Sequence, residues 1–344
     1  MANFWHTLPA GFIGLSPMDG VTDCAFRTIS KKHGNPDVMY TEFTSVEGIA
    51  HGATRLLRDF LYEETQRPII AQVFGHTPRD FYTSTIVVCE LGFDAIDINM
   101  GCPMKNIASQ GSGAALIRTP KLAQEIIRSV QQAVIDWSNG KTLDDIDLTD
   151  EMKSVLSQRK VSRQDKEPLP VSVKTRIGYD NPVIEEWIPN LLEMKPVAIA
   201  IHGRTLKQAY SGQAQWEFIG KAVELAKDSD TLMIGNGDVK SVAHARERIR
   251  DYGVDGVLIG REAFGNPWIF KEKIPTASER FSVAIEHVEL YEKLHSHEAF
   301  YQFIPMRKHL GWYIKDMPRA AEIRQQLFSS HTAEEVLHIL KNNL

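Results

Sequence analysis

The sequence predicts an α/β protein, a (β/α)8 TIM barrel followed by a small all-helical C-terminal domain. Short strand-like runs alternate with amphipathic helix-like segments over most of the chain, and the residues after 274 show only helical periodicity. Eight such β and α units favour a closed barrel over an open doubly wound sheet. No Gly-x-Gly-x-x-Gly motif opens a first unit, which further disfavours a dinucleotide-binding fold.

The expected strands are short apolar runs rich in β-branched residues. They cover Phe12–Leu15, Asp37–Tyr40, Ile69–Phe74, Ala95–Ile98, Val171–Lys174, Ala198–Ile201, Leu232–Ile234 and Gly256–Ile259. The amphipathic segments between them predict the barrel helices, among them Pro120–Ile135, Val183–Met194, Trp216–Ala226 and Val242–Tyr252.

A polar, mixed-charge interval at about 139–168 interrupts this alternation. It is longer than a usual connection between a helix and the next strand. Within it, the pattern of residues 149–160 predicts one short helix. Such a connection lies at the amino-terminal, non-catalytic face of a barrel. We interpret it as a peripheral insertion without a catalytic part, and a contact with a partner stays open.

The chain divides at about residue 273. Residues 1–273 are expected to form the catalytic barrel, with Lys271–Pro275 as the exit from its last helix. Residues 274–344 are expected to form a separate helical domain, in which apolar residues recur at helical spacing at Phe281, Ile285, Val288, Tyr291 and Leu294.

Composition narrows the class of protein. A chain of 344 residues with 43% hydrophobic residues can bury a large core, and a net charge of -5 argues against a general polyanion binder while leaving room for a local basic face. Cys24, Cys89 and Cys102 show neither a disulfide nor a metal-ligand pattern, which indicates a reducing compartment. No signal peptide or membrane-spanning run is visible. These features predict a soluble cytoplasmic protein without a metal site.

The run from Ile96 to Pro103 is the most informative segment. It reads as a buried strand with a polar end, after which Gly101 breaks the strand and Pro103 fixes the backbone beside Cys102. A thiol held on a rigid loop at the carboxyl end of a barrel strand is placed for chemistry. A small buried cysteine in a turn is the alternative.

Most of the other expected strands also end in groups that can bind or react. These groups are Ser16 to Gly20, Gln72, Asn99, Lys174 with Arg176, His202 with Arg204, Gly235 to Asp238, and Gly260 with Arg261. The last two segments follow strands seven and eight, where TIM barrels commonly bind a phosphate group. Together with Lys174 they predict a phosphorylated cofactor. Alone, each glycine segment could be a simple turn and Lys174 could face solvent.

Together these residues resemble the tRNA-dihydrouridine synthases, flavin enzymes that reduce uridine in tRNA. The resemblance covers nearly the whole chain. Its motifs, in order, are Pro17–Asp23 with Phe26-Arg27, Asn99–Pro103 with Lys105 and 111–114, Val173–Arg176, His202–Thr205, Gly235–Asp238, Ile259–Arg261 and Arg307–Tyr313. Two features depart from the family pattern: Asp19 stands where many members carry Ala or Glu, and the insertion is atypical.

The resemblance implies roles for the matching positions. FMN would be held by Pro17, Met18, Asp19, Gln72, Lys174, His202, Asn236, Gly237, Asp238, Gly260 and Arg261. Cys102 would be the proton donor, and Asn99, Arg176 and Tyr210 would face the target uracil. NADPH would re-reduce the flavin, with NADH as the alternative donor. His202 could equally be a packed histidine at a strand end.

The chemistry of the reaction agrees with these roles. Reducing the 5,6 double bond of uracil requires a hydride at one carbon, which a reduced flavin supplies, and a proton at the other. A thiol with its ordinary pKa of ~8.5 is mostly protonated at neutral pH and can donate that proton. Use of Cys102 as a nucleophile would need a lowered pKa and a fixed base, and the sequence shows no dedicated histidine beside it. Lys174 would stabilise the reduced anionic flavin.

A tRNA substrate also explains the helical domain, because a uridine in folded RNA must be drawn out into the barrel mouth. Residues 305–324 hold two acidic residues and two aromatics, Trp312 and Tyr313, among the basic residues Arg307, Lys308, Lys315, Arg319 and Arg324. We interpret this stretch as a tRNA-binding strip, with Arg307 and Lys308 as its first candidates. An ordinary solvated helix with two core aromatics is the alternative.

Two other function classes stay open. A different flavin barrel enzyme, such as a dihydroorotate- or enoate-type reductase, would use a strand-end lysine and phosphate loops but would not need a basic helical domain. A non-catalytic RNA-binding protein could keep that domain, but would have no reason to retain Cys102, Lys174 and the phosphate loops together. No obligate protein partner is evident, and the tRNA position that is reduced is not encoded in any single motif.

Overall fold

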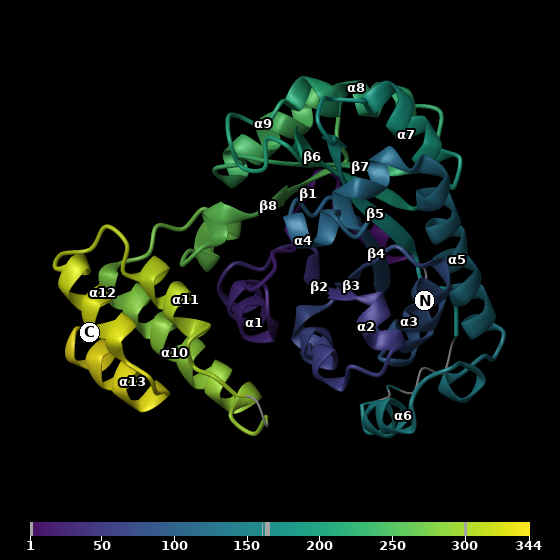
Figure 1. Ribbon diagram of the computed structural model, residues 1–344. Coiled ribbons are helices and arrows are strands. Elements are labelled where there is room, and N and C mark those ends of the chain that lie inside the picture. The colour runs from purple at the N-terminus through teal and green to yellow at the C-terminus, as the bar shows by residue number, and fades with distance from the viewer. Residues whose placement is uncertain (1–2, 160, 162–165, 299–300) are drawn as a thin grey trace.

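The computed structural model describes residues 3–159, 161, 166–298 and 301–344. Eight parallel strands pair in sequence order, and β1 closes the barrel on β8 (Figure 1). The predicted TIM barrel is therefore confirmed. Its strands are β1 (Phe12–Leu15), β2 (Met39–Ser45), β3 (Ile69–Phe74), β4 (Ala95–Met100), β5 (Val171–Gly178), β6 (Ala198–Thr205), β7 (Leu232–Asn236) and β8 (Gly256–Ile259).

Helices surround the barrel (Figure 1). They are α1 (Cys24–His33), α2 (Val46–Ala50), α3 (Pro78–Glu90), α4 (Lys105–Ala108), α5 (Pro120–Ser138), α7 (Ile184–Leu192), α8 (Trp216–Ala226) and α9 (Val242–Tyr252). The bounds of α8 and α9 agree with the predicted segments, whereas α5 continues to Ser138. Pro120 at the first turn of α5 suits a position where the missing N–H has no helical partner.

Several strands extend beyond their predicted bounds. β5 and β6 continue past Lys174 and Ile201 because they stay paired, with Arg176 opposite His202. β2 extends to Ser45 but begins later than predicted, at Met39. The side chain of Asp37, the first residue of the predicted strand, accepts a hydrogen bond from the N–H of Ile13 at 2.8 Å. The polar residues expected after β5 and β6 therefore lie inside these strands, near their carboxyl ends.

No long helix follows β8. The expectation of a last barrel helix ending near residue 271 is wrong. Residues 260–276, which are all described, contain only the short 3-10 helices η6 (Arg261–Ala263) and η7 (Pro267–Lys271). Between them Gly265 has φ +62°, and a Cβ there would lie 2.5 Å from the backbone of Trp312. The C-terminal helices therefore pack against this side of the barrel directly.

The C-terminal region consists of α10 (Ala277–His295), α11 (Met306–Tyr313), α12 (Ala320–Ser329) and α13 (Ala333–Asn342). Its hydrophobic core is continuous with the barrel, since Ala25 and Ile29 of α1 and Trp268 of η7 belong to the same buried cluster. Lys32 and His33 of α1 also bind the Glu286 carboxylate, at 2.6 and 2.9 Å. This shared core fixes the helical region beside the barrel mouth.

The predicted insertion contains η5 (Leu143–Asp145) and α6 (Asp150–Ser157). The predicted helix 149–160 is thus shorter at its end, and residues 160 and 162–165 lie outside the described part. Arg159 anchors the segment by donating to the backbone carbonyls of Leu57 at 2.7 Å and Phe60 at 3.0 Å in η2 (Thr54–Phe60). No described residue of the insertion lines the main cleft.

Candidate active site

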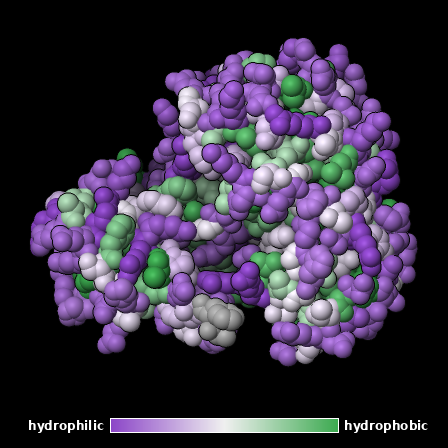
Figure 2. All heavy atoms as spheres, viewed as in Figure 1, coloured by the Kyte–Doolittle hydropathy of each residue, from purple (hydrophilic) through white to green (hydrophobic). Residues whose placement is uncertain are grey.

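The carboxyl ends of the strands open into a cleft of about 1440 Å³ between the barrel and the C-terminal helices, and Figure 2 shows the molecule hollowed there. Every site residue predicted in the barrel lines this cleft. They are Pro17, Met18, Asp19, Gln72, Asn99, Cys102, Lys174, Arg176, His202, Tyr210, Asn236, Gly237, Asp238, Gly260 and Arg261. The two residues predicted in the helical region, Arg307 and Lys308, lie outside it.

Cys102 follows β4 directly, and Asn99 fixes its loop. The side-chain oxygen of Asn99 accepts hydrogen bonds from the backbone N–H of Cys102 at 2.9 Å and of Gly101 at 3.0 Å. Cys102 is 5% exposed and lines the cleft. The thiol is therefore presented by a backbone whose polar groups are satisfied at the strand end.

A chain of buried hydrogen bonds holds Asn99 in turn. Its amide nitrogen donates to Gln72 at 3.0 Å, and the amide nitrogen of Gln72 donates to the Asp97 carboxylate at 2.7 Å. Ser172 donates to the other oxygen of Asp97 at 2.6 Å. Burial raises the pKa of Asp97 to about 6, so it still accepts as a carboxylate at neutral pH. Asn99 and Gln72 thus support the loop, and both also line the cleft, where contacts to uracil and cofactor are predicted for them.

The environment of Cys102 keeps its thiol protonated. Burial raises the pKa of Cys102 above its ordinary value, and the nearby Asp19 acts in the same direction. Arg176 and Lys174 offset part of this effect. At neutral pH the group therefore offers a proton rather than a thiolate.

Arg176 connects two loops at the cleft. Its Nε donates to the carbonyl of Gly101 at 2.6 Å, and its terminal nitrogen donates to Thr205 and Ala209, each at 3.2 Å. The second loop carries Tyr210, which is 62% exposed and lies 5.7 Å from the Arg261 guanidinium. Arg176 thus places the Cys102 loop relative to the Tyr210 side chain.

Lys174 brings a positive charge to the cleft, and the nearby Asp97 carboxylate offsets part of it. Within the described part of the chain its ammonium makes no hydrogen bond or ion pair. Burial and the neighbouring Arg176 lower the pKa of Lys174 to about 8. Burial and the same cations hold the pKa of His202 well below its usual value, so its imidazole is neutral.

The other end of the cleft is built from the turns after β7 and β8. Asp238 accepts from Arg204 and from Arg261, each at 2.6 Å, and the Arg261 side chain stays 50% exposed. Gly237 has φ +125°, a conformation that side chains rarely adopt, and a Cβ there would lie 2.7 Å from Ala214 Cβ. A Cβ at Gly260 would lie 3.5 Å from Met18 Sδ. Glycine turns beside an arginine suit an anionic group.

The basic residues predicted to form a tRNA-binding strip have different surroundings. The Arg307 guanidinium donates to the backbone carbonyl of Ser330, and Arg319 is paired with Glu322. Arg324 donates to the carbonyl of Gly311 at 3.2 Å. Lys308 and Lys315 make no side-chain hydrogen bond or ion pair among the described residues. The charge of Lys308 offsets part of the rise in the pKa of Asp19. Among the basic residues of the strip, these two lysines are thus the most available to a ligand.

The two aromatics of this strip have different surroundings. Trp312 is partly buried, lines the cleft and stacks on Phe264 of the barrel, with ring centroids 4.1 Å apart. Tyr313 is 1% exposed and hydrogen-bonds to His287 at 3.1 Å. The alternative interpretation, a core aromatic in an ordinary helix, therefore describes Tyr313, whereas Trp312 stands at the cleft.

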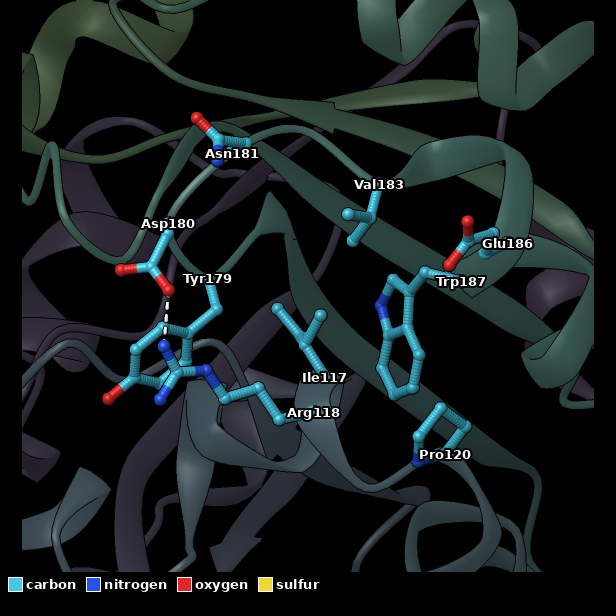
Figure 3. Close-up of a pocket in the computed structure, with 9 residues that line it drawn as sticks. All are labelled: Ile117, Arg118, Pro120, Tyr179, Asp180, Asn181, Val183, Glu186 and Trp187. Carbon is cyan, nitrogen blue, oxygen red and sulfur yellow. Dashed lines mark hydrogen bonds and ion pairs between the residues drawn. The ribbon is translucent and has the colours of Figure 1, made fainter.

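A second pocket, of about 250 Å³, lies between the segment after the Cys102 loop and the turn after β5 (Figure 3). Two of its charged groups are paired: Arg118 binds Asp180 and lies 3.6 Å from the Tyr179 ring. Val183 and Trp187 add apolar surface, and Glu186 is the third charged residue of the lining. The described residues that line this pocket include no lysine or cysteine comparable to Lys174 and Cys102 of the cleft.

Comparison with known families decides between the possible flavin barrels. The family model described as Dihydrouridine synthase (Dus) matches residues 14–142 and 143–344. The chain belongs to the dihydrouridine synthase family. The match spans both the barrel and the C-terminal helices, which confirms the resemblance seen in the sequence.

Curated relatives agree with this membership. The "Probable tRNA-dihydrouridine synthase" of Staphylococcus epidermidis is 32% identical, over 98% of this chain and 95% of the relative. The "Probable tRNA-dihydrouridine synthase 2" of Bacillus subtilis is also 32% identical, over the same shares. A solved DHODH from Eimeria tenella has a TM-score of 0.51 at 11% identity, covering 82% of this chain and 81% of that one, and shares the fold.

In this dihydrouridine synthase family member, Phe43, Asp97 and Ser172 were not predicted as site residues. Phe43 lines the cleft because pairing shifts register in β2 between Tyr40 and Phe43, a feature without a local sequence signal. Asp97 and Ser172 meet across β4 and β5, which only strand register reveals.

Within the described residues, no helix has the length and apolar character needed to cross a membrane.

Proposed function

We propose that this protein reduces specific uridines of tRNA to dihydrouridine, using FMN that NADPH re-reduces and Cys102 as the general acid. One observation carries the proposal: in a chain matched by the dihydrouridine synthase family model, a protonated thiol and the unpaired ammonium of Lys174 line the same cleft. NADH is the alternative electron donor.

The residues of the cleft fit a flavin mononucleotide. Its phosphate would be held by Arg261 and the backbone around Gly237 and Gly260, and Asp238 would orient Arg261. Lys174 would meet the electron-rich edge of the ring system, which provides the acceptor that its ammonium lacks in the protein. Pro17, Met18, Asp19, Gln72, His202 and Asn236 complete the proposed cofactor-binding set. When bound, the flavin supplies the hydride.

The role of Cys102 follows from its protonation state. Burial raises the pKa of the thiol, which favours proton donation over nucleophilic attack. Asn99 and Arg176 hold the backbone around Cys102 so that the proton is delivered from a fixed direction. Tyr210 stands exposed at the cleft and would contact the uracil ring.

We further propose that residues 274–344 form the tRNA-binding domain. The hydrophobic core shared with α1 holds this domain at the barrel mouth. Lys308 lies close to Gly20 on the barrel rim: a Cβ built on Gly20 would be 3.0 Å from the Nζ of Lys308. Lys315 is exposed and lines the cleft. Both lysines would meet phosphates of an RNA whose target base enters the barrel. None of the three cysteines forms a disulfide, which suits a cytoplasmic location.

The decisive experiment compares turnover on intact tRNA and on free uridine, with the purified flavin-loaded protein and NADPH. We expect efficient reduction of tRNA only, because distant phosphate contacts supply the binding energy that positions the base. Comparable efficiency on both substrates would favour a small-molecule flavin reductase. A preparation that neither contains nor binds FMN would refute the cofactor proposal itself.

A further inference from the structure

Glu47, His76 and Ser112 form a chain of polar contacts beside the Cys102 loop, outside the residues that line the cleft. The Nδ1 atom of His76 lies 3.1 Å from the Ser112 hydroxyl and 3.3 Å from the Glu47 carboxylate. The three residues come from α2, from the connection between β3 and α3, and from the turn before the 3-10 helix η4 (Gly113–Arg118).

The Glu47 end of this chain is rigid. Its carboxylate also accepts from the backbone N–H groups of His76 at 2.8 Å and Thr77 at 3.2 Å. A Cβ at Gly75 would lie 2.6 Å from both carboxylate oxygens, so the close approach depends on glycine at this position. His76 is thereby fixed to the carboxyl ends of β2 and β3.

The Ser112 end reaches the cysteine. Ser112 is 1% exposed, and the next residue, Gly113, packs so closely that its Cβ would lie 3.1 Å from Cys102 Cβ. The N–H of Ala114 donates to the Cys102 carbonyl at 3.2 Å. A displacement of Ser112 would therefore also move the backbone that carries the Cys102 thiol.

This geometry does not form a nucleophilic triad. In such a triad the acid and the hydroxyl bind opposite nitrogens of the imidazole, whereas here both lie at Nδ1. The single ring atom Nδ1 thus brings the Ser112 hydroxyl and the Glu47 carboxylate side by side. The chain is therefore suited to fixing a loop.

We infer that His76 is a positioning residue for Cys102, latching the 111–114 turn to the ends of β2 and β3. The hydrogen bonds of Asn99 hold the Cys102 loop from inside the barrel, and the His76–Ser112 contact holds it from the rim. The inference rests on the proposed function at one point only: the proposed function gives the Cys102 thiol its role as general acid. The latch itself is a property of the folded chain.

The test measures alkylation of Cys102 by iodoacetamide in the purified flavin-loaded protein, followed by mass spectrometry. We expect His76→Ala and Ser112→Ala each to raise the rate at Cys102 by about three- to tenfold, as expected when one hydrogen bond no longer opposes loop opening. The double variant should react no faster than either single variant, because both changes open one latch.

Matched variants separate the latch from general destabilisation. His76→Asn keeps an amide N–H near the position of Nδ1 and should restore slow alkylation, while Arg79→Ala, an exposed change in the first turn of α3, should have no effect. Cys24 and Cys89 are buried internal references. Unchanged labelling of Cys102 in both alanine variants, or an equal rise at all three cysteines, would overturn the inference.

Steady-state kinetics on tRNA provide a second readout. The alanine variants should lower kcat and leave KM for tRNA unchanged, because the RNA contacts lie elsewhere. Since alkylation needs no substrate, a chain that fails to reduce tRNA could still show the latch, and the two proposals can fail independently. A rise in KM with unchanged kcat would place His76 in substrate binding instead.

Discussion

The Asn99 side chain determines where Cys102 stands: its oxygen accepts from the backbone N–H of Cys102 at 2.9 Å, while its nitrogen donates to Gln72 at 3.0 Å. An asparagine suits this position because one planar group must accept on one side and donate on the other. The cysteine loop is thereby tied to β3 as well as to β4.

Asn99→Ala should separate loop positioning from cofactor binding. We expect a loss of uridine reduction on the order of 10²-fold, the effect of misplacing a reacting group by about 1 Å. FMN content and NADPH oxidation should stay near wild type, since Arg261 and Lys174 are untouched. Full activity in single-turnover assays would show that the loop holds its geometry without Asn99.

Cys102→Ala should abolish proton donation alone. Removing a general acid typically lowers the rate by about 10²–10⁴-fold, so uridine reduction should fall by that factor. Stopped-flow reduction of the bound flavin by NADPH should proceed normally. A variant that reduces tRNA at the wild-type rate would assign Cys102 a purely structural role.

Arg261→Ala should weaken FMN binding. The change removes a charge-assisted contact to the phosphate, and we expect a loss of roughly 1.5–3 kcal/mol in binding free energy. Fluorescence titration of the flavin-free protein measures the dissociation constant. Tyr179→Phe, a change at the second pocket, serves as the matched control.

The affinity for FMN should depend on pH through Lys174. Its pKa is lowered to about 8, so the ammonium is charged below that pH and becomes neutral above it. FMN binding should therefore weaken as the pH rises through about 8. Lys174→Arg, which stays charged, should remove this dependence, and Lys174→Met should weaken binding over the whole range. A wild-type affinity that is flat between pH 7 and 9 would contradict the proposed contact.

Binding of tRNA should depend on Lys308 and Lys315. Each alanine substitution should raise the dissociation constant for tRNA and lower the slope of log affinity against log salt by about one. FMN content should not change. If neither substitution alters the salt slope, the RNA phosphates lie on another face.

Arg307 and Arg319 provide the contrast within the same strip. Arg307→Ala should chiefly lower the free energy of unfolding, because its guanidinium donates to the carbonyl of Ser330. Arg319→Ala should have a small effect, since its exposed pair with Glu322 contributes little to stability. Thermal denaturation beside tRNA titration distinguishes the two kinds of residue.

Much of the active site followed from the sequence because strand ends are locally encoded. Apolar runs bounded by glycine, proline and polar residues marked β1, β3 and β8 at their observed bounds. In a parallel barrel the carboxyl ends of all strands face one side, so the sequence alone predicts that Lys174, Cys102 and Arg261 share a cleft. Family motifs, also local, supplied the expected chemistry.

The sequence by itself thus determined the barrel, the helical C-terminal region and the strand-end residues of the cleft that carry chemistry, such as Cys102, Lys174 and Arg261. Only the tertiary structure decided which polar atoms meet: Asp97 with Ser172, His76 with Ser112, and Arg307 with Ser330. Such pairs are far apart in the chain, and strand register and loop packing bring them together. A pattern of residue types records whether a side chain can donate or accept a hydrogen bond, whereas the packed fold selects its partner.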